Sequence, residues 1–120
     1  MDYTNKVVAI TGGARGIGLA MGQAFHARGA QIALADLDGA ETAAQAFGGL
    51  GMIVDVTVEG QVAEFVQKTE AALGPIDVYV SNAGVLMTDE PSWDAAGATD
   101  ANWQLAFEVN LMGAVRGARH

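Results

Sequence analysis

Residues 7–18 read VVAITGGARGIG, a short apolar and mostly β-branched run that is followed by three spaced glycines, Gly12, Gly16 and Gly18. Apolar residues then recur at helical spacing, so the sequence predicts a strand, a glycine turn and a helix. Such a unit points backbone N–H groups and a helix N-terminus at a phosphate. We expect Gly12 to turn the chain off the strand, Gly16 to leave room for a pyrophosphate, and Gly18 to let the helix lie close to the sheet.

The glycine pattern has alternatives when it is taken alone. Its spacing is Gly-x-x-x-Gly-x-Gly, and glycine makes up 16 of the 120 residues, about twice its usual share. An ordinary tight turn between a strand and a helix therefore remains an alternative. A nucleoside-triphosphate loop is disfavoured, because no Lys-Ser or Lys-Thr follows the glycines.

Composition narrows the classes of function. The chain is 51% hydrophobic, which supports a real core, and we expect residues 1–120 to form one domain. The net charge is −8 and the six Lys and Arg residues are scattered, which disfavours nucleic acid as a partner. The absence of cysteine excludes disulfides, thiolate metal sites and a cysteine nucleophile, and we expect no bound metal. No stretch is apolar enough for a signal region or a membrane span, so we expect a cytoplasmic protein without a membrane partner.

Predicted strands and helices alternate along the chain. Thr57 is the expected N-cap of the third helix, although Gly60 stands where Glu or Gln would complete a capping box. The alternation predicts a parallel sheet with right-handed crossovers, that is, an α/β fold of the doubly wound Rossmann type with strand order 3-2-1-4. The expected strands cover residues 6–11, 31–35, 52–54 and 77–80, and the expected helices cover residues 16–28, 39–47, 57–73 and a segment that begins at residue 99 or 100.

Asp36 directly follows the second predicted strand. A dinucleotide-binding fold places a carboxylate in this region, against the ribose hydroxyls of adenosine. A 2′-phosphate would face Asp36, with Leu37 and Asp38 beside it, and like charges about 4 Å apart repel by about 4 kcal/mol at an effective dielectric near 20. We therefore expect NAD rather than NADP, although Arg15 in the glycine turn could reach a phosphate. The alternative is that Asp36 simply begins a loop.

Two later stretches carry polar residues at notable places. Ser81, Asn82, Ala83 and Gly84 follow the fourth predicted strand, and small residues there let a ligand approach the edge of the sheet. A simple loop is the alternative for this stretch. Asn110 lies on the apolar face of the last predicted helix, where an amide requires a partner or a bend in the helix.

These stretches together resemble the short-chain dehydrogenases/reductases. Residues 11–18 match the family's cofactor motif Thr-Gly-x-x-x-Gly-Ile-Gly, and residues 82–84 match its Asn-Ala-Gly motif. Asp55 matches the acidic residue that meets the adenine ring, and Asn110 matches the helical Asn of the catalytic tetrad. The four motifs stand in the family's order across essentially the whole chain. A methyltransferase would share the glycine loop and an acidic residue after the second strand, but not the other two motifs.

The resemblance implies that the chain binds a nicotinamide dinucleotide, in a family that transfers hydride between the nicotinamide ring and a carbonyl or alcohol carbon. It implies that Ile17 and the glycine backbone hold the pyrophosphate and nicotinamide side, that Asp36 holds the ribose, and that Asp55 and Val56 hold the adenine. Asn110 would position a water in a proton relay and is the expected catalytic residue. The expected cofactor-binding residues are Gly12, Arg15, Gly16, Ile17, Gly18, Asp36, Leu37, Asp55, Val56, Asn82, Ala83 and Gly84.

One part of the family pattern is absent from this sequence. The family's catalytic Ser and Tyr-x-x-x-Lys should follow Asn110 by some tens of residues, and residues 111–120 contain no Ser, Tyr or Lys. We therefore expect the N-terminal, cofactor-binding half of such an enzyme, inactive alone. Its fourth strand would be an edge with unpaired backbone groups, so we expect a homo-oligomer or a companion chain that supplies the other half. A non-catalytic nucleotide-binding or assembly module is the alternative function.

Overall fold

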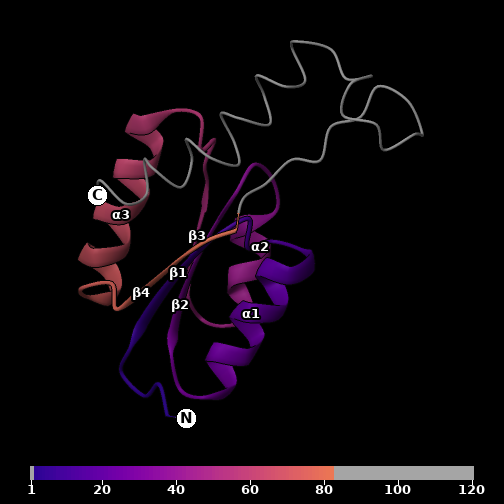
Figure 1. The fold of residues 1–120 in the computed structure, drawn as a ribbon, viewed down its shortest axis with the longest axis vertical. Coiled ribbons are helices and arrows are strands. Elements are labelled where there is room, and N and C mark those ends of the chain that lie inside the picture. Colours follow the sequence, from indigo (N-terminus) through magenta and orange to yellow (C-terminus); the bar gives the residue numbers. More distant parts are fainter. Residues whose placement is uncertain (1, 83–120) are drawn as a thin grey trace, which may run out of the picture.

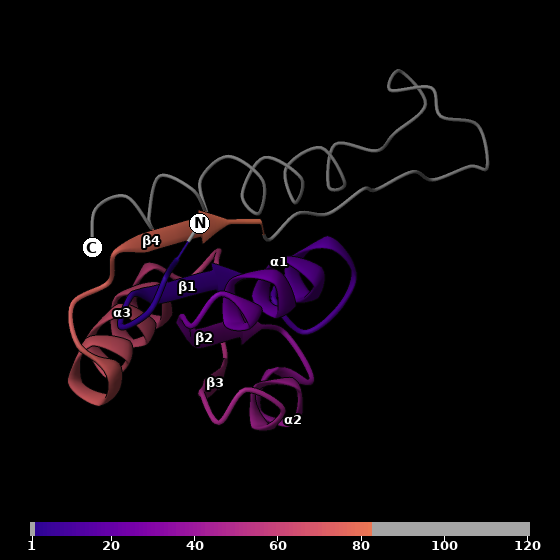
Figure 2. The same ribbon diagram turned by 90° about the horizontal axis from the view of Figure 1, so that it is seen from below.

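Four parallel strands form one sheet in the part of the chain that the computed structural model describes, residues 2–82. The order across the sheet is β3-β2-β1-β4, which confirms the predicted α/β fold of the Rossmann type. Helices α1 and α2 cover one face of the sheet and α3 covers the other (Figures 1 and 2). The elements are β1 (Val7–Thr11), α1 (Gly16–Ala27), β2 (Gln31–Asp36), α2 (Ala40–Gln45), β3 (Leu50–Ile53), α3 (Glu59–Leu73) and β4 (Val78–Ser81).

The core lies on both faces of the two central strands, β1 and β2. All five residues of β1 are buried, as expected of a parallel strand that is covered on both sides. Branched side chains of these strands point toward α1 and α2, whereas the alanines between them point toward α3. The small alanines leave the volume that the fully buried Phe65 of α3 fills. The branched set is Val8, Ile10, Ile32 and Leu34, and the alanine set is Ala9, Ala33 and Ala35.

The region of α2 and β3 departs most from the predicted boundaries. Helix α2 is shorter than predicted, and β3 begins at Leu50, two residues before the predicted start at residue 52. The glycine cluster after α2 does more than end a helix. A Cβ atom on Gly51 would overlap the carbonyl oxygen of Ala40, so this glycine lets α2 lie directly against β3. A close approach of this kind has no pattern in the sequence beyond the glycine itself.

The predicted N-cap of α3 is wrong. The helix begins at Glu59, Val58 occupies the N-cap position, and no side chain there caps the helix. Thr57 instead donates both its N–H and its hydroxyl to Oδ1 of Asp55, at 2.9 Å and 2.6 Å. Oε1 of Gln61 accepts the N–H of Asp55 at 2.7 Å. The carboxylate is the stronger acceptor, so it holds Thr57 in a turn before the helix, and Asp55 and Gln61 organise the connection from β3 to α3.

Candidate functional site

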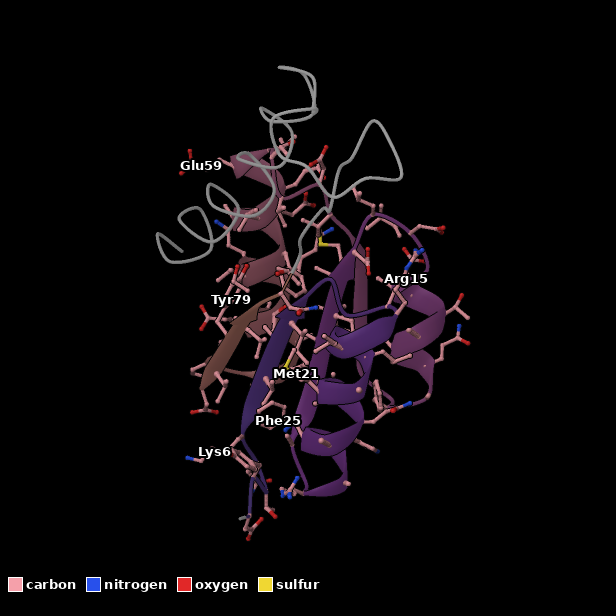
Figure 3. The ribbon with its side chains drawn as sticks, turned by 45° about the vertical axis from the view of Figure 1, so that its right-hand side comes forward. Lys6, Arg15, Met21, Phe25, Glu59 and Tyr79 are labelled. Carbon is pink, nitrogen blue, oxygen red and sulfur yellow. The ribbon has the colours of Figure 1, made fainter. Side chains whose placement is uncertain are left out.

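The carboxyl ends of the four strands meet along one edge of the sheet, where the glycine turn joins β1 to α1 (Figure 1). Open parallel sheets bind ligands outside this edge. Figure 3 shows Arg15 and Glu59 at this end of the molecule and Lys6 at the opposite end. The predicted cofactor-binding residues up to residue 82 therefore lie at strand ends, in loops and at helix starts along a single edge.

The glycine turn is built by three glycines with different surroundings. Gly12 and Gly16 adopt the left-handed backbone conformation, with φ of 66° and 58°. A Cβ atom on Gly18 would overlap the carbonyl oxygen of Gly12 and lie 2.7 Å from Nδ2 of Asn82, so α1 packs against the turn itself as well as near the sheet. Apart from its chain neighbours and the backbone of its own helix, a Cβ atom on Gly16 would meet no atom of residues 2–82 within 4 Å. The turn is therefore tight on the side of Gly18 and open on the side of Gly16.

The side chain of Asp36 points into this turn. Its Oδ2 accepts the N–H of Ala14 at 3.0 Å, and its Oδ1 accepts the N–H of Leu37 at 2.8 Å. A carboxylate offers about four acceptor positions, and these two bonds within the described residues use two of them. The geometry fixes the carboxylate between the glycine turn and the loop after β2, with acceptor capacity for two ligand hydroxyls.

The end of β4 is tied to the same turn. Nδ2 of Asn82 donates to the carbonyl oxygen of Gly12 at 3.3 Å, and the Asn82 N–H donates to Oγ1 of Thr11 at 3.1 Å. The Thr11 hydroxyl in turn donates to the carbonyl oxygen of Val80 at 3.4 Å. Thr11 was not among the predicted site residues. The sequence signal that could have identified it is a polar residue at the end of an otherwise apolar strand. In the structure Thr11 is 2% exposed.

The connection from β3 to α3 contributes Asp55 and Val56. Asp55 lies at the carboxyl edge as predicted, and the hydrogen bonds that the structure gives it organise its own loop. Val56 belongs to the buried cluster beneath α3. Both residues therefore lie at this edge, where Asp55 holds its loop by hydrogen bonds and Val56 packs in the core.

Exposed apolar side chains gather at this edge. The large hydrophobic residues that are exposed within residues 2–82 all lie at the start of a helix or the carboxyl end of a strand on this side. Ile17 is 73% exposed and Leu37 is 61% exposed. Both side chains flank the glycine turn and the loop after β2, so a ligand at this edge could cover them. The other two residues are Ile53 and Val58.

Arg15 is directed across the turn toward the loop after β2. Its Nη2 lies 3.7 Å from Oδ2 of Asp38 and donates to the Asp38 carbonyl oxygen at 3.4 Å. Both side chains are well exposed, so the pair contributes little to stability. Sequence reasoning placed Asp38 beside the ribose but missed this pairing, because it joins two loops.

Three predicted site residues, Ala83, Gly84 and Asn110, lie outside the described residues. Within residues 2–82, no group of three or more His, Asp or Glu side chains is arranged to hold a metal ion. No helix in the same range is long and apolar enough to cross a membrane.

The family model described as short chain dehydrogenase matches residues 6–120. The chain belongs to this family. Sequence relatives agree with the assignment. Galactitol 2-dehydrogenase of Agrobacterium fabrum is 39% identical over 120 residues, which cover 94% of this chain and 44% of the relative. L-fucose dehydrogenase of Bos taurus is 37% identical over 114 residues, which cover 92% of this chain and 41% of the relative.

A solved structure shares the fold as well. The crystal structure of 3-ketoacyl-(acyl-carrier-protein) reductase from Brucella melitensis complexed with NADH superposes with a TM-score of 0.91 at 28% identity. The match covers 98% of this chain and 49% of that one. The chain thus spans less than half the length of each of these relatives.

Proposed function

We propose that these 120 residues form the part of a short chain dehydrogenase that binds a nicotinamide dinucleotide. The observation that carries the proposal is the glycine turn. Its backbone is open at Gly16, where a Cβ atom would meet no other part of the described chain within 4 Å, and closed at Gly18. The exposed N-terminus of α1 behind this open face is suited to a diphosphate. The bound NADH of the Brucella melitensis reductase supports the same ligand for this chain.

The remaining groups at the edge fit the other parts of such a ligand. The Asp36 carboxylate retains acceptor positions for two ribose hydroxyls beside the turn. Ile17 and Leu37 offer exposed apolar surface that an aromatic ring or a sugar face would cover. Asp55, Val56 and Asn82 lie along the same edge, and Ala83 and Gly84, which follow Asn82 in the sequence, complete the proposed binding residues. Gly12 and Arg15 contribute the bend and a positive charge to the turn.

We propose NAD rather than NADP as the preferred form. A 2′-phosphate would lie against the Asp36 carboxylate, and the repulsion between the two would be strong in a partly buried site. The positive charge of Arg15, which would offset this repulsion, is already paired with Asp38. The complete enzyme would transfer hydride between the nicotinamide ring and an alcohol or carbonyl substrate.

The family's catalytic Ser and Tyr-x-x-x-Lys, which would carry out the chemical step, are absent from this sequence after Asn110. No Ser, Tyr or Lys follows Asn110 within the 120 residues. We propose that Asn110 belongs to the proton relay and that the general acid–base groups come from further sequence or from a companion chain. The same observation keeps a second candidate, a non-catalytic nucleotide-binding module. The two functions differ in one measurement, which is whether a companion half confers turnover on a chain that binds the dinucleotide.

Calorimetric titration of the 120-residue chain with NAD⁺ tests the binding proposal. Gly16→Ala adds a methyl group to the open face and should weaken NAD⁺ binding at least tenfold. Gly48→Ala is the matched control, because Gly48 has φ of 59° and precedes β3 at the opposite edge, and a Cβ atom there would also meet no described atom within 4 Å. Both substitutions strain the backbone by about 1–2 kcal/mol. Equal NAD⁺ affinities for the two variants, or no binding by the unsubstituted chain, would contradict the proposal.

A further inference from the structure

The loop from β3 to α3 holds Asp55 by most of its polar groups. The Asp55 N–H donates to Oε1 of Gln61 at 2.7 Å, and the Asp55 carbonyl oxygen accepts the Val58 N–H at 3.0 Å. Oδ1 of Asp55 accepts both the N–H and the hydroxyl of Thr57. Within residues 2–82, Oδ2 makes no hydrogen bond. Oδ2 is therefore the carboxylate oxygen that Asp55 has available for a ligand.

Gln61 links this loop to the body of α3. With Val58 at the N-cap, Gln61 is the third residue of the helix. In a capping box, a Gln at this position reaches back to the backbone N–H of the N-cap residue. The Gln61 side chain instead reaches past the N-cap to Asp55. Because the adjacent Val62 is fully buried, the helix fixes the place of Gln61, and Gln61 in turn fixes the backbone from which the Asp55 carboxylate extends.

The strand order places Asp55 beyond Asp36 as seen from the glycine turn. The turn follows β1, Asp36 ends β2, and Asp55 follows β3, the outer neighbour of β2. Along one half of the dinucleotide, the order is diphosphate, ribose and adenine. A ligand with its diphosphate at the turn and its ribose at Asp36 would therefore bring its adenine ring to Asp55. A carboxylate only accepts hydrogen bonds, and the exocyclic amino group is the donor that adenine offers.

We infer that Gln61 is a positioning residue of the cofactor site, which directs Oδ2 of Asp55 at the exocyclic amino group by holding the Asp55 backbone. The inference rests on the proposed function, in which Asp55 is one of the dinucleotide-binding residues. Gln61 acts through Asp55 and does not itself contact the ligand. Without an acceptor on Gln61, the Asp55 N–H loses its partner and the direction of the carboxylate is no longer fixed. The site then loses its preference for a base that carries an amino group.

Calorimetric titration of the 120-residue chain with two dinucleotides measures this preference. NAD⁺ carries the amino group, whereas nicotinamide hypoxanthine dinucleotide carries an oxygen in its place. Gln61→Met keeps the length of the side chain without its acceptor. It should weaken NAD⁺ binding by about fivefold, the effect of one hydrogen bond, and change binding of the hypoxanthine dinucleotide by less than about twofold. Gln61→Glu keeps an acceptor oxygen and should retain the NAD⁺ affinity to within about twofold.

Two controls test the route of the effect. Gln67→Met makes the same substitution at an exposed position of α3 and should leave both affinities unchanged. Gln61→Met is also introduced into an Asp55→Ala chain, which completes a double-mutant cycle. Once the carboxylate is absent, we expect Gln61→Met to leave the ratio of the two affinities unchanged.

The ratio of the two affinities separates positioning from a merely structural role, because partial unfolding weakens both ligands equally. If Q61M lowers both affinities by the same factor, the side chain only stabilises the loop and the inference is overturned. It is also overturned if Q67M or Q61E lowers the ratio as Q61M does, or if Q61M still lowers the ratio without Asp55. In each of these cases, NAD⁺ binding by the unsubstituted chain still supports the proposed function. If the unsubstituted chain binds neither dinucleotide, the proposed function fails and the inference fails with it.

Discussion

Two glycines of α1 differ in what surrounds them, and this difference predicts opposite effects of the same substitution. A Cβ atom on Gly18 would overlap the carbonyl oxygen of Gly12, whereas a Cβ atom on Gly22 would make ordinary contacts of 3.5–3.7 Å. Gly18→Ala should lower the free energy of unfolding by about 1–3 kcal/mol through overpacking. Gly22→Ala should raise it by up to about 1 kcal/mol, because alanine favours helix. Urea denaturation measures both, and changes of the same sign would contradict the packing described for the glycine turn.

The Tyr79 hydroxyl makes no hydrogen bond within the described residues although it is buried. Burial raises the pKa of the Tyr79 phenol above its ordinary value of 10.0. Tyr79→Phe removes an unpaired polar atom, so at pH 7 we expect unchanged stability or a gain of up to about 1 kcal/mol.

The raised pKa of Tyr79 predicts that the free energy of unfolding depends on pH in the alkaline range. Below pH 10 the phenol is neutral in both the folded and the unfolded chain, so ionisation of Tyr79 does not reduce the free energy of unfolding. Above pH 10 the unfolded chain ionises first, and the free energy of unfolding falls until the pH passes the folded pKa. Urea denaturation from pH 8 to pH 11 should show a steeper loss for the natural chain than for Y79F. Parallel curves would show that Tyr79 is not buried as described.

At the scale of single elements, α3 has no side-chain cap at its N-terminus, and a substitution at the N-cap position could add one. Val58 stands at the N-cap with φ of −108° and ψ of 105°, an extended conformation typical of that position, and it is 43% exposed. Val58→Asp should add about 1 kcal/mol of stability by accepting an N–H of the first turn and by placing a negative charge at the helix N-terminus. Val58→Ala is the control and should give no such gain. A thermal melt measures both, and equal melting temperatures for the two variants would contradict the described cap.

Features that depend on neighbouring residues in the sequence could be predicted, whereas features that depend on contacts between distant segments could not. The order of β1 to β4 was predictable, because apolar runs alternate with helical patterns and right-handed crossovers leave few topologies. Asp36 was placed correctly because it simply ends a strand. The cap of α3 was not predictable, because Thr57 has two possible partners and only the fold shows that Asp55 binds it. The pair of Arg15 and Asp38 depends on the approach of two loops, for which the sequence has no periodic pattern.

At the scale of the whole molecule, the two edge strands of the described sheet, β3 and β4, differ in how far they are covered. On one side β3 is covered in part by α2, which lies directly against it. On the other side β4 pairs with β1, and no described strand pairs with its outer edge. An uncovered strand edge pairs readily with another chain. The relatives are more than twice as long as the matched part, which leaves ample sequence to cover such an edge in a complete enzyme.

We therefore predict that the isolated 120-residue chain associates, either with itself or with a polypeptide that carries the other half. Sedimentation velocity should show species heavier than the 12.3 kDa monomer, whose share rises with concentration. Ser81→Lys places a charge on the exposed end of β4 and should reduce this association, because lysine on an edge strand opposes pairing. Ser81→Gln is the control of similar length without the charge. A monodisperse monomer with one cooperative melting transition would contradict the prediction, since such a chain would have no unsatisfied edge for a partner to cover.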